Sequence, residues 1–589
     1  MMDVRPFGAA GASRSTGFLP RLPDVGAVVI YILFGLLIGL PLLTVLMQAV
    51  MPGLFDTKDP SYALNAAPLL RTFASPRVVN SVLHSVELAA GVAVLSTALG
   101  GLFAVLVQRF ALPLRGLILS APWLIFLTPG YLKAMAWVLL MAPGGYLAQL
   151  GLMPDGMSRA FFGLGGLIFV HTISLFPLSA FIIGGALAGL GSDLEDAARL
   201  SGASVWRVWG QINLPLLRPA IILSCIAIFA EVLSDFGLAT TIARTAGFGV
   251  LTYGIYAAAS DYPVDFPMAG TQALILLCLI LVVFTIERSI RRKADPRLIS
   301  GRSRAVRLYE AGAGRWVATG IALVIVLLAL YLPMAAILAR AFTDTLGRGL
   351  ALSNFTLANM AEATRLGAPA SGALVRSLVY SLITAVFSTG LALILCGQLD
   401  RASATVKAAV LGVAVGSIAI PGIVLGFGYI LVWNRLPGFR EWPFPHYGDA
   451  SLLITGYIAT ALPYCLVVIL SAVGQLAPSL GDAARVHGAG AFTRLIRITL
   501  PLVLLAVVTA FLLTFIRTVF ELPISQLLVP QSGSPAPPYV VRLLGHDSEG
   551  PAAALTLVSM VLAGGLAAAG WIVARRFLTF GDAPGKGAS

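Results

Sequence analysis

Charged residues are unusually scarce in this sequence. Charged residues make up 11% of the 589 residues, against roughly 25% in a soluble globular protein. Hydrophobic residues make up 58%, so too few polar side chains remain to cover a water-facing surface. A soluble enzyme, a nucleic-acid-binding protein and a disordered scaffold are therefore excluded, and no nucleic-acid partner is expected. The composition predicts an integral membrane protein.

Cysteine is also scarce, and a nucleotide-binding loop is missing. The four cysteines, Cys225, Cys278, Cys396 and Cys465, lie inside apolar runs without ligand-like spacing. This placement is typical of small core side chains and of neither disulfides nor a metal site. No G-x-x-x-x-G-K-[ST] phosphate loop occurs anywhere in the sequence. We therefore expect a chain that is not an enzyme and that binds no cofactor itself.

What the sequence does have is long apolar runs. A membrane-spanning helix needs about 20 apolar residues, and about twelve such runs predict an all-α polytopic membrane protein. Pro219, Glu231 and Arg517 interrupt two of them. The runs cover residues 25–49, 82–107, 116–141, 162–189, 217–238, 269–287, 316–339, 376–398, 408–432, 451–474, 502–522 and 552–574.

The basic residues predict the orientation of these spans. Arginines are found in the tail at 1–24, nine Lys and Arg lie in the linker at 288–315, and Arg575 and Arg576 open the tail at 575–589. Basic loops stay in the cytoplasm, and an even number of crossings puts all three segments on one side. Both termini and the linker are therefore expected to be cytoplasmic.

The two halves of the chain repeat each other. The stretch that begins at Asp196 (DAARLSGA) returns at Asp482 (DAARVHGA), an offset of 286, and an Ile-x-Leu-Pro motif follows each copy. Six spans per half give both halves the same direction through the membrane. We expect two parallel repeats, at 25–287 and 316–574, related by a pseudo-two-fold axis along the membrane normal.

Each copy of the repeated stretch has the chemistry of a short helix, a turn and a second short helix. Ser192-x-x-Glu195 and Ser479-x-x-Asp482 fit a capping box, and Gly202 and Gly488 stand where a helix can end. The proline of each Leu-Pro pair suits the first turn of the next span. An ordinary amphipathic connecting loop is the alternative, but two copies at matched positions argue against it.

These motifs resemble the EAA loop of binding-protein-dependent ABC importer permeases, in the form that fuses two permease domains in one chain. The loops lie at 190–215 and 476–501. Asp196 and Asp482 stand where that family most often has Glu. The resemblance implies a bacterial-type inner membrane, two separate ATP-binding subunits that seat on the loops and carry the ATP, and an extracytoplasmic solute-binding protein. The residues that it implies at the joint with the ATP-binding subunits are Glu195, Asp196, Ala197, Ala198, Gly202, Asp482, Ala483, Ala484 and Gly488.

Ionisable residues inside the apolar runs are candidates for the transport path, because such residues are rare in membranes. Glu87 and Lys133 either line the path or have a structural role, in which they pair with each other or with neighbouring backbone. Asp235 and Glu521 differ by the repeat offset of 286, which suggests an acidic pair facing a cationic cargo; solvated helix ends are the alternative.

Other conspicuous residues have simpler interpretations. His171 and His487 have no partners at ligand spacing and are expected in packing or at the surface. Arg517 and Glu521 have the i, i+4 spacing of a local ion pair. Pro129-Gly130 and Pro421-Gly422 break two spans at matched places, as a hinge or as a static bend.

The cargo is the least determined property. The size and arrangement resemble ferric-iron importers, and importers of thiamine, 2-aminoethylphosphonate or polyamines share the fold. An ion-coupled secondary transporter would need a cluster of mid-membrane carboxylates, of which this chain has few. A pore without energy input would leave both loops unexplained.

Overall fold

The computed structural model describes residues 25–55, 61–190, 193–293, 312, 314–399, 403–436, 439, 446–546 and 548–580. In this part of the chain every named element is a helix, and the only β-type pairing is one isolated bridge between Thr343 and Phe355. The all-α prediction is confirmed.

Ten helices, counted over the described ranges, are long and apolar enough to cross a membrane, and the number is twelve if two bent pairs each count as one span. The long helices are α1 (Val25–Phe34) with α2 (Leu40–Val50), α4 (Pro76–Arg109), α9 (Leu164–Gly189), α12 (Leu214–Ser234), α15 (Phe266–Lys293), α16 (Gly314–Val326) with α17 (Leu332–Ala341), α19 (Pro369–Gln398), α22 (Ala450–Val473), α25 (Leu500–Val519) and α28 (Glu549–Phe580). The bent pairs are α5 (Arg115–Leu127) with α6 (Gly130–Met141), and α20 (Ala404–Ile418) with α21 (Gly422–Ile430).

Short helices connect these spans. They are α3 (Ala67–Ala74), α7 (Tyr146–Gln149), α8 (Met157–Phe161), α10 (Asp193–Leu200), α11 (Val205–Val208), α13 (Gly237–Ala246), α14 (Leu251–Ser260), α18 (Ala358–Thr364), α23 (Pro478–Val486), α24 (Ala491–Arg494), α26 (Pro523–Leu527) and α27 (Ala536–Leu544).

The two predicted breaks are sharper than kinks. The chain turns by 106° between α5 and α6 and by 90° between α20 and α21. Proline has no amide hydrogen and disfavours a helical conformation in the residue before it; Thr128, directly before Pro129, is accordingly extended. The runs at 116–141 and 408–432 are therefore not straight spans, since each is two helices that meet at a Pro-Gly corner.

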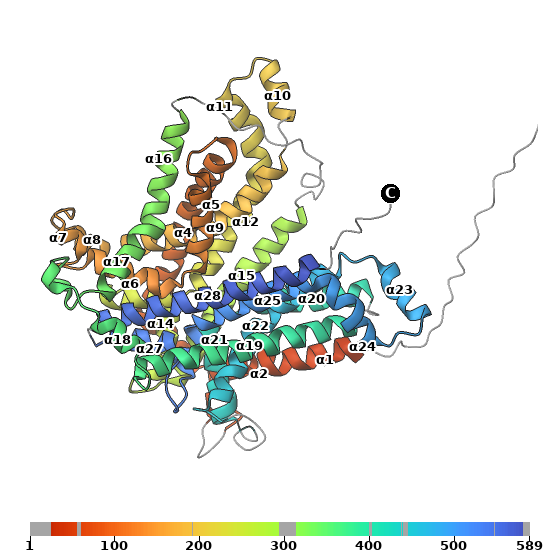
Figure 1. The fold of residues 1–589 in the computed structure, drawn as a ribbon. Helices are drawn as coiled ribbons and strands as arrows, with labels where there is room; N and C mark the ends of the chain where they lie inside the picture. The colour runs from red at the N-terminus through yellow and green to blue at the C-terminus, as the bar shows by residue number, and fades with distance from the viewer. Residues whose placement is uncertain are drawn as a thin grey trace, which may run out of the picture.

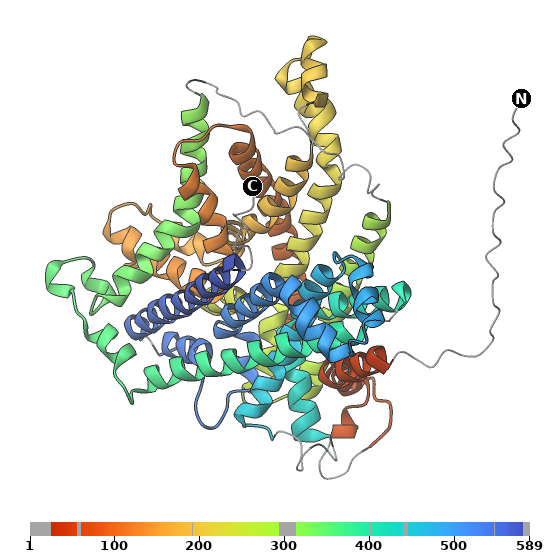
Figure 2. The same cartoon turned by 45° about the vertical axis from the view of Figure 1, so that its right-hand side comes forward.

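Matched helices form the core of each half. The helices α4, α9 and α12 pack together in the first half, and α19, α22 and α25 do so in the second. Small residues allow close contact: a Cβ on Gly100 of α4 would lie 2.5 Å from the carbonyl oxygen of Phe176 on α9. Such small-residue contacts are what holds membrane helices together. Figures 1 and 2 show the first-half core rising toward α10 while the second-half core runs toward α23, so the two bundles point in different directions.

The first span of each repeat packs against the other half. Helix α2 contacts α15 of its own half and α21 of the second half, and α17 contacts α28 of its own half and α6 of the first. The Tyr429 hydroxyl on α21 donates to the Leu37 carbonyl (3.0 Å), and a Cβ on Gly428 would lie 2.5 Å from the Pro41 carbonyl oxygen. The first span of each half thus lies at the contact between the two halves and packs against helices of both.

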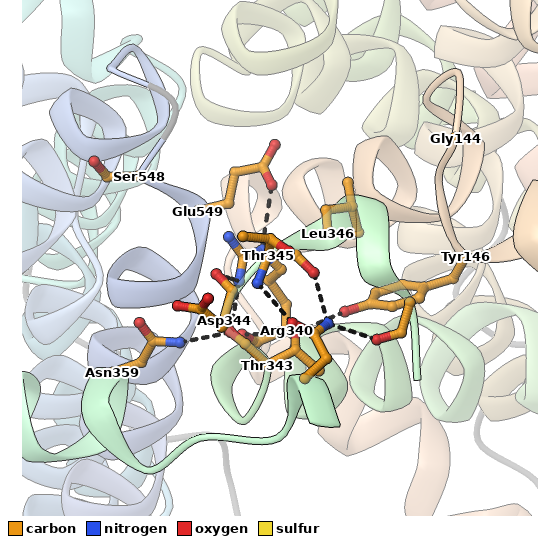
Figure 3. Close-up of polar contacts among 12 residues, drawn as sticks. Gly144, Tyr146, Arg340, Thr343, Asp344, Thr345, Leu346, Asn359, Ser548 and Glu549 are labelled. Atoms are coloured by element: carbon orange, nitrogen blue, oxygen red, sulfur yellow. Dashed lines mark hydrogen bonds and ion pairs between the residues drawn. The ribbon is translucent and has the colours of Figure 1, made fainter. Parts of the chain in front are cut away.

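A polar network fixes the end of α17 to both halves (Figure 3). The Arg340 guanidinium, 6% exposed, is 3.3 Å from the carboxylate of Glu549 at the start of α28. It also donates to the Thr343 carbonyl at 2.9 Å. The Tyr146 hydroxyl of the first half lies 3.3 Å from the Thr343 hydroxyl, and the Gln149 amide donates to the Leu346 carbonyl at 2.7 Å.

Candidate functional site

The repeated loops have the same turn. Gly202 follows α10 with φ +81°, and Gly488 follows α23 with φ +79°. In the first loop the amide of Gly202 donates to the Arg199 carbonyl (2.9 Å) and that of Ala203 to the Ala198 carbonyl (3.0 Å). The second loop repeats both hydrogen bonds at matched residues, 2.9 Å and 3.0 Å long. This pattern ends a helix through a left-handed residue, a conformation that glycine adopts without strain.

Two details of the loops differ from the sequence prediction. Ser479 does not cap α23, because the helix begins at Pro478 and its N-cap residue is Ala477; Ser192 lies outside the described residues. The second segments, α11 and α24, continue through a π-helical turn into α12 and α25. They are the first turns of the spans themselves. The Leu-Pro prolines, Pro215 and Pro501, therefore lie directly after the π-helical turn inside a continuous helix, and not in the first turn of the span as predicted.

Each loop exposes matched large apolar side chains. Leu200 is 91% and Val486 86% exposed, and they differ by the repeat offset. The second matched pair is Trp206, 87% exposed, and Phe492, 76% exposed. Large apolar side chains held out from the ends of both bundles mark a surface for a partner. The sequence contained this signal in the alignment of the two copies.

The predicted loop residues divide into outward and inward groups. Asp196, Ala197 and Ala483 are exposed, and so are the two turn glycines. Ala198 is half-buried and Ala484 is buried. The side chain of Asp482 lies outside the described part of the chain.

Glu195 points inward. Its carboxylate is 2.8 Å from the Arg109 guanidinium at the end of α4 and accepts from the Asn213 amide at 3.1 Å. Arg109 is 1% and Glu195 5% exposed. The matched positions of the second loop, Gly481 and Thr499, cannot repeat this arrangement. Glu195 therefore ties the first loop to α4 and the base of α12 within the chain.

Asp235 and Glu521 cap matched short helices. The Asp235 carboxylate accepts from the amides of Leu238 and Ala239, at 3.0 Å and 2.9 Å, at the start of α13. The Glu521 carboxylate accepts from the amides of Ile524 and Ser525, at 2.8 Å and 3.0 Å, at the start of α26.

Both capping carboxylates also stand beside the Pro-Gly corners. A Cβ on Gly130 would lie 3.4 Å from Asp235, and one on Gly422 would lie 3.6 Å from Glu521. Both acids are half-buried. The two predicted acids therefore occupy equivalent sites where a bent helix, a span and a short helix meet.

Lys133 and Glu87 do not pair with each other. The Lys133 ammonium is buried and donates to the Ile125 carbonyl at 3.2 Å, near the end of α5. Its charge interacts with Asp235 and Glu231. Glu87 is exposed on α4.

His171 has a partner that the sequence did not indicate. The ring is buried; its Nδ1 is 2.9 Å from the Leu167 carbonyl, and its Nε2 is 3.5 Å from the Asp235 carboxylate. The packing position expected for His171 is confirmed, although its contact with Asp235 was not predicted, and His487 is exposed as expected.

Arg517 is not ion-paired with Glu521 as its spacing suggested. Its guanidinium lies over the Tyr464 ring, 4.0 Å from the ring centre. It also interacts electrostatically with Glu231 of the first half. The sequence analysis did not connect Glu231 with Arg517, although their spacing equals the repeat offset.

The fold and these sites define a class: a helical membrane permease with first spans that contact both halves of the chain and with one copy of a repeated loop in each half. Residues 391–576 match the family described as "binding-protein-dependent transport system inner membrane component". The molybdenum transport system permease protein ModB of Escherichia coli is 32% identical over 161 residues, which cover 27% of this chain and 70% of ModB. The chain belongs to this family of importer permeases.

Two relatives align with most of the chain. The putative ferric transport system permease protein FbpB 1 of Haemophilus influenzae is 26% identical over 458 residues, 76% of this chain and 70% of the relative. The ferric transport system permease protein FbpB of Actinobacillus pleuropneumoniae is 23% identical over 503 residues, 84% of this chain and 71% of the relative.

The buried pair that holds the first loop gives a stability prediction. Arg109→Met leaves the Glu195 carboxylate buried without its cation, which costs about 3–5 kcal/mol, so we expect a large fall in the thermal unfolding midpoint of the purified protein. The control is Arg365→Met, which breaks an exposed pair with Glu362 and should cost less than about 1 kcal/mol. Equal midpoints for the two variants would show that the buried pair does not hold the loop.

Proposed function

We propose that this ABC importer permease works with two separate ATP-binding subunits, one seated on each loop, and that these subunits bind and hydrolyse the ATP. The observation that carries the proposal is the matched exposure of Leu200 with Val486 and of Trp206 with Phe492. Two equivalent apolar surfaces fit two copies of one partner. Because α11 and α24 run directly into α12 and α25, a movement of either partner would be passed to a span without a flexible joint.

The outward residues give each surface its chemistry. Asp196 adds a carboxylate beside the apolar side chains of the first loop, and Ala197 and Ala483 present small exposed faces on which another backbone can lie closely. Glu195 contributes by positioning the first loop rather than by touching the partner, since its carboxylate is held inside the chain.

The orientation follows from the same proposal. ATP-binding subunits require the loops to be cytoplasmic, which agrees with the basic linker and tails. Both termini then lie on the cytoplasmic side of a bacterial-type inner membrane. A phosphatase fusion near Arg297 should be inactive and a fluorescent protein fusion there should be bright. The opposite pair of results would reverse the orientation.

The turn glycines test the coupling. A β-branched residue is strained at positive φ by about 1–2 kcal/mol, whereas asparagine tolerates that conformation. In the described part of the chain nothing lies within 4 Å of a Cβ added at Gly202 or Gly488, so a side chain there meets backbone strain but no steric clash. We expect Gly202→Val and Gly488→Val to reduce uptake several-fold at equal expression, and Gly202→Asn to retain most of it, as measured in reconstituted vesicles. Normal uptake by both valine variants would contradict the coupling role.

For the cargo we propose ferric iron delivered by an extracytoplasmic binding protein. The support is the likeness to two permeases named for ferric transport, together with the matched acids Asp235 and Glu521 at the corners between the halves. Among the described residues no three potential ligand side chains gather around one point. A cation would meet single carboxylates, which suits passage better than tight binding. Thiamine, 2-aminoethylphosphonate and polyamines remain alternatives, and the solute bound by the purified partner protein distinguishes them.

Neutralising the acids tests the cargo's charge. The variant Asp235→Asn with Glu521→Gln removes both charges but keeps an acceptor oxygen for each cap. We expect ferric uptake to fall several-fold because attraction to a cation in a low-dielectric path is lost, while binding of the ATP-binding subunits is unchanged. Asp155→Asn, at an exposed acid, is the matched control. An unchanged uptake rate for the double variant would exclude both acids from the path.

A further inference from the structure

Glu231 and Arg517 stand at equivalent positions in the two halves. They differ by the repeat offset of 286, and each lies four residues before one of the capping acids, on α12 and α25. Both side chains are exposed to solvent, although the halves meet close by: a Cβ on Gly237 would lie 3.5 Å from both the Leu522 side chain and the Tyr131 amide. The two charged side chains therefore lie close to a contact between the halves.

The charges around the two residues come from both halves. Glu231 interacts with Lys133 and Asp235 of its own half and with Arg517 of the other. Arg517 is held over the Tyr464 ring and interacts with Glu231 and Glu521. No ion pair of 4.0 Å or less joins Glu231 to Arg517 in the described part of the chain.

Opposite charges at these two positions make the halves attract each other there, whereas like charges would make them repel. Glu231 and Arg517 are near enough to interact, so a faithful repeat would place two equal charges at these positions and they would repel. One glutamate and one arginine attract instead, and the attraction strengthens as the space between the halves dries. Because an unpaired charge inside a membrane protein is costly, the two side chains favour any movement that brings them together.

We propose that Glu231 and Arg517 are a charge pair that closes the path between the halves when α12 and α25 approach, and that this structure holds the pair open. The proposal rests on the permease function, on a path between the halves and on a cargo that is a cation, but not on which cation it is. In the open state Tyr464 holds the arginine and leaves Glu231 free to attract a cationic cargo. When the halves approach, Arg517 replaces the cation at Glu231, which releases the cargo and prevents its return.

A charge exchange tests the pair in the complete complex reconstituted in vesicles. Glu231→Arg and Arg517→Glu each place like charges across the path, so each should slow uptake by about tenfold or more. The double exchange restores opposite charges and should recover uptake to within about threefold of the unaltered protein. Single variants that transport normally, or a double variant no better than the singles, would overturn the proposal.

A cross-linking experiment covers the case in which the charge variants do not fold. Glu231→Cys with Arg517→Cys is made in a protein whose four natural cysteines are replaced by alanine. An oxidant should link the pair in one nucleotide state of the ATP-binding subunits and not in the other, and reductant should restore their transport-coupled ATPase activity. The control is Glu87→Cys with Arg517→Cys, since Glu87 lies exposed on α4 and should not link. Absence of a link in every nucleotide state would overturn the proposal.

The cross-linking experiment separates this proposal from the cargo assignment, because formation of the link is measured without any cargo. A protein that links its cysteine pair but imports no iron would contradict ferric transport and support the charge pair.

Discussion

Backbone hydrogen bonding inside the membrane is the constraint on which the rest of this structure depends. Lipid offers no partner for an amide or a carbonyl, so a helix can break there only where other protein groups satisfy the freed atoms. The chain breaks at Pro129 and Pro421 and supplies those groups nearby: Lys133 donates to a carbonyl near the end of α5, while Asp235 and Glu521 accept the first amides of α13 and α26. The few ionisable residues of the interior thus stabilise the corners and charge the space between the halves at the same time.

The first spans join the two similar bundles into one permease. The first span of each half packs against helices of both halves, so each core is partly covered by residues of the other half. The Arg340 network extends this connection, since it links the end of α17 both to α28 and to the first half through Tyr146 and Gln149. The loop ends of the two bundles point in different directions (Figure 2). They can move while contacts of this kind remain fixed.

The repeat is symmetric in backbone and asymmetric in charge. Turns, corners and caps match between the halves, because they follow from backbone geometry that both copies share. The matched positions of the second half lack the Arg109–Glu195 pair, and the position that matches Glu231 holds Arg517 rather than another glutamate. The first loop is consequently tied to α4 by a buried ion pair, and the two halves can attract each other at positions where identical residues would repel.

The sequence by itself determined the helical membrane class, the number of apolar runs, the internal repeat, the turn glycines and the Pro-Gly breaks. These features depend on composition, on local backbone preference and on spacing along one chain. Only the tertiary structure decided which half the first spans join, that Glu195 faces Arg109, that His171 faces Asp235, and that Arg517 lies over Tyr464 instead of pairing with Glu521. Those outcomes depend on contacts between residues tens to hundreds of positions apart, and apolar spans in lipid can pack in several ways that leave the same hydropathy pattern.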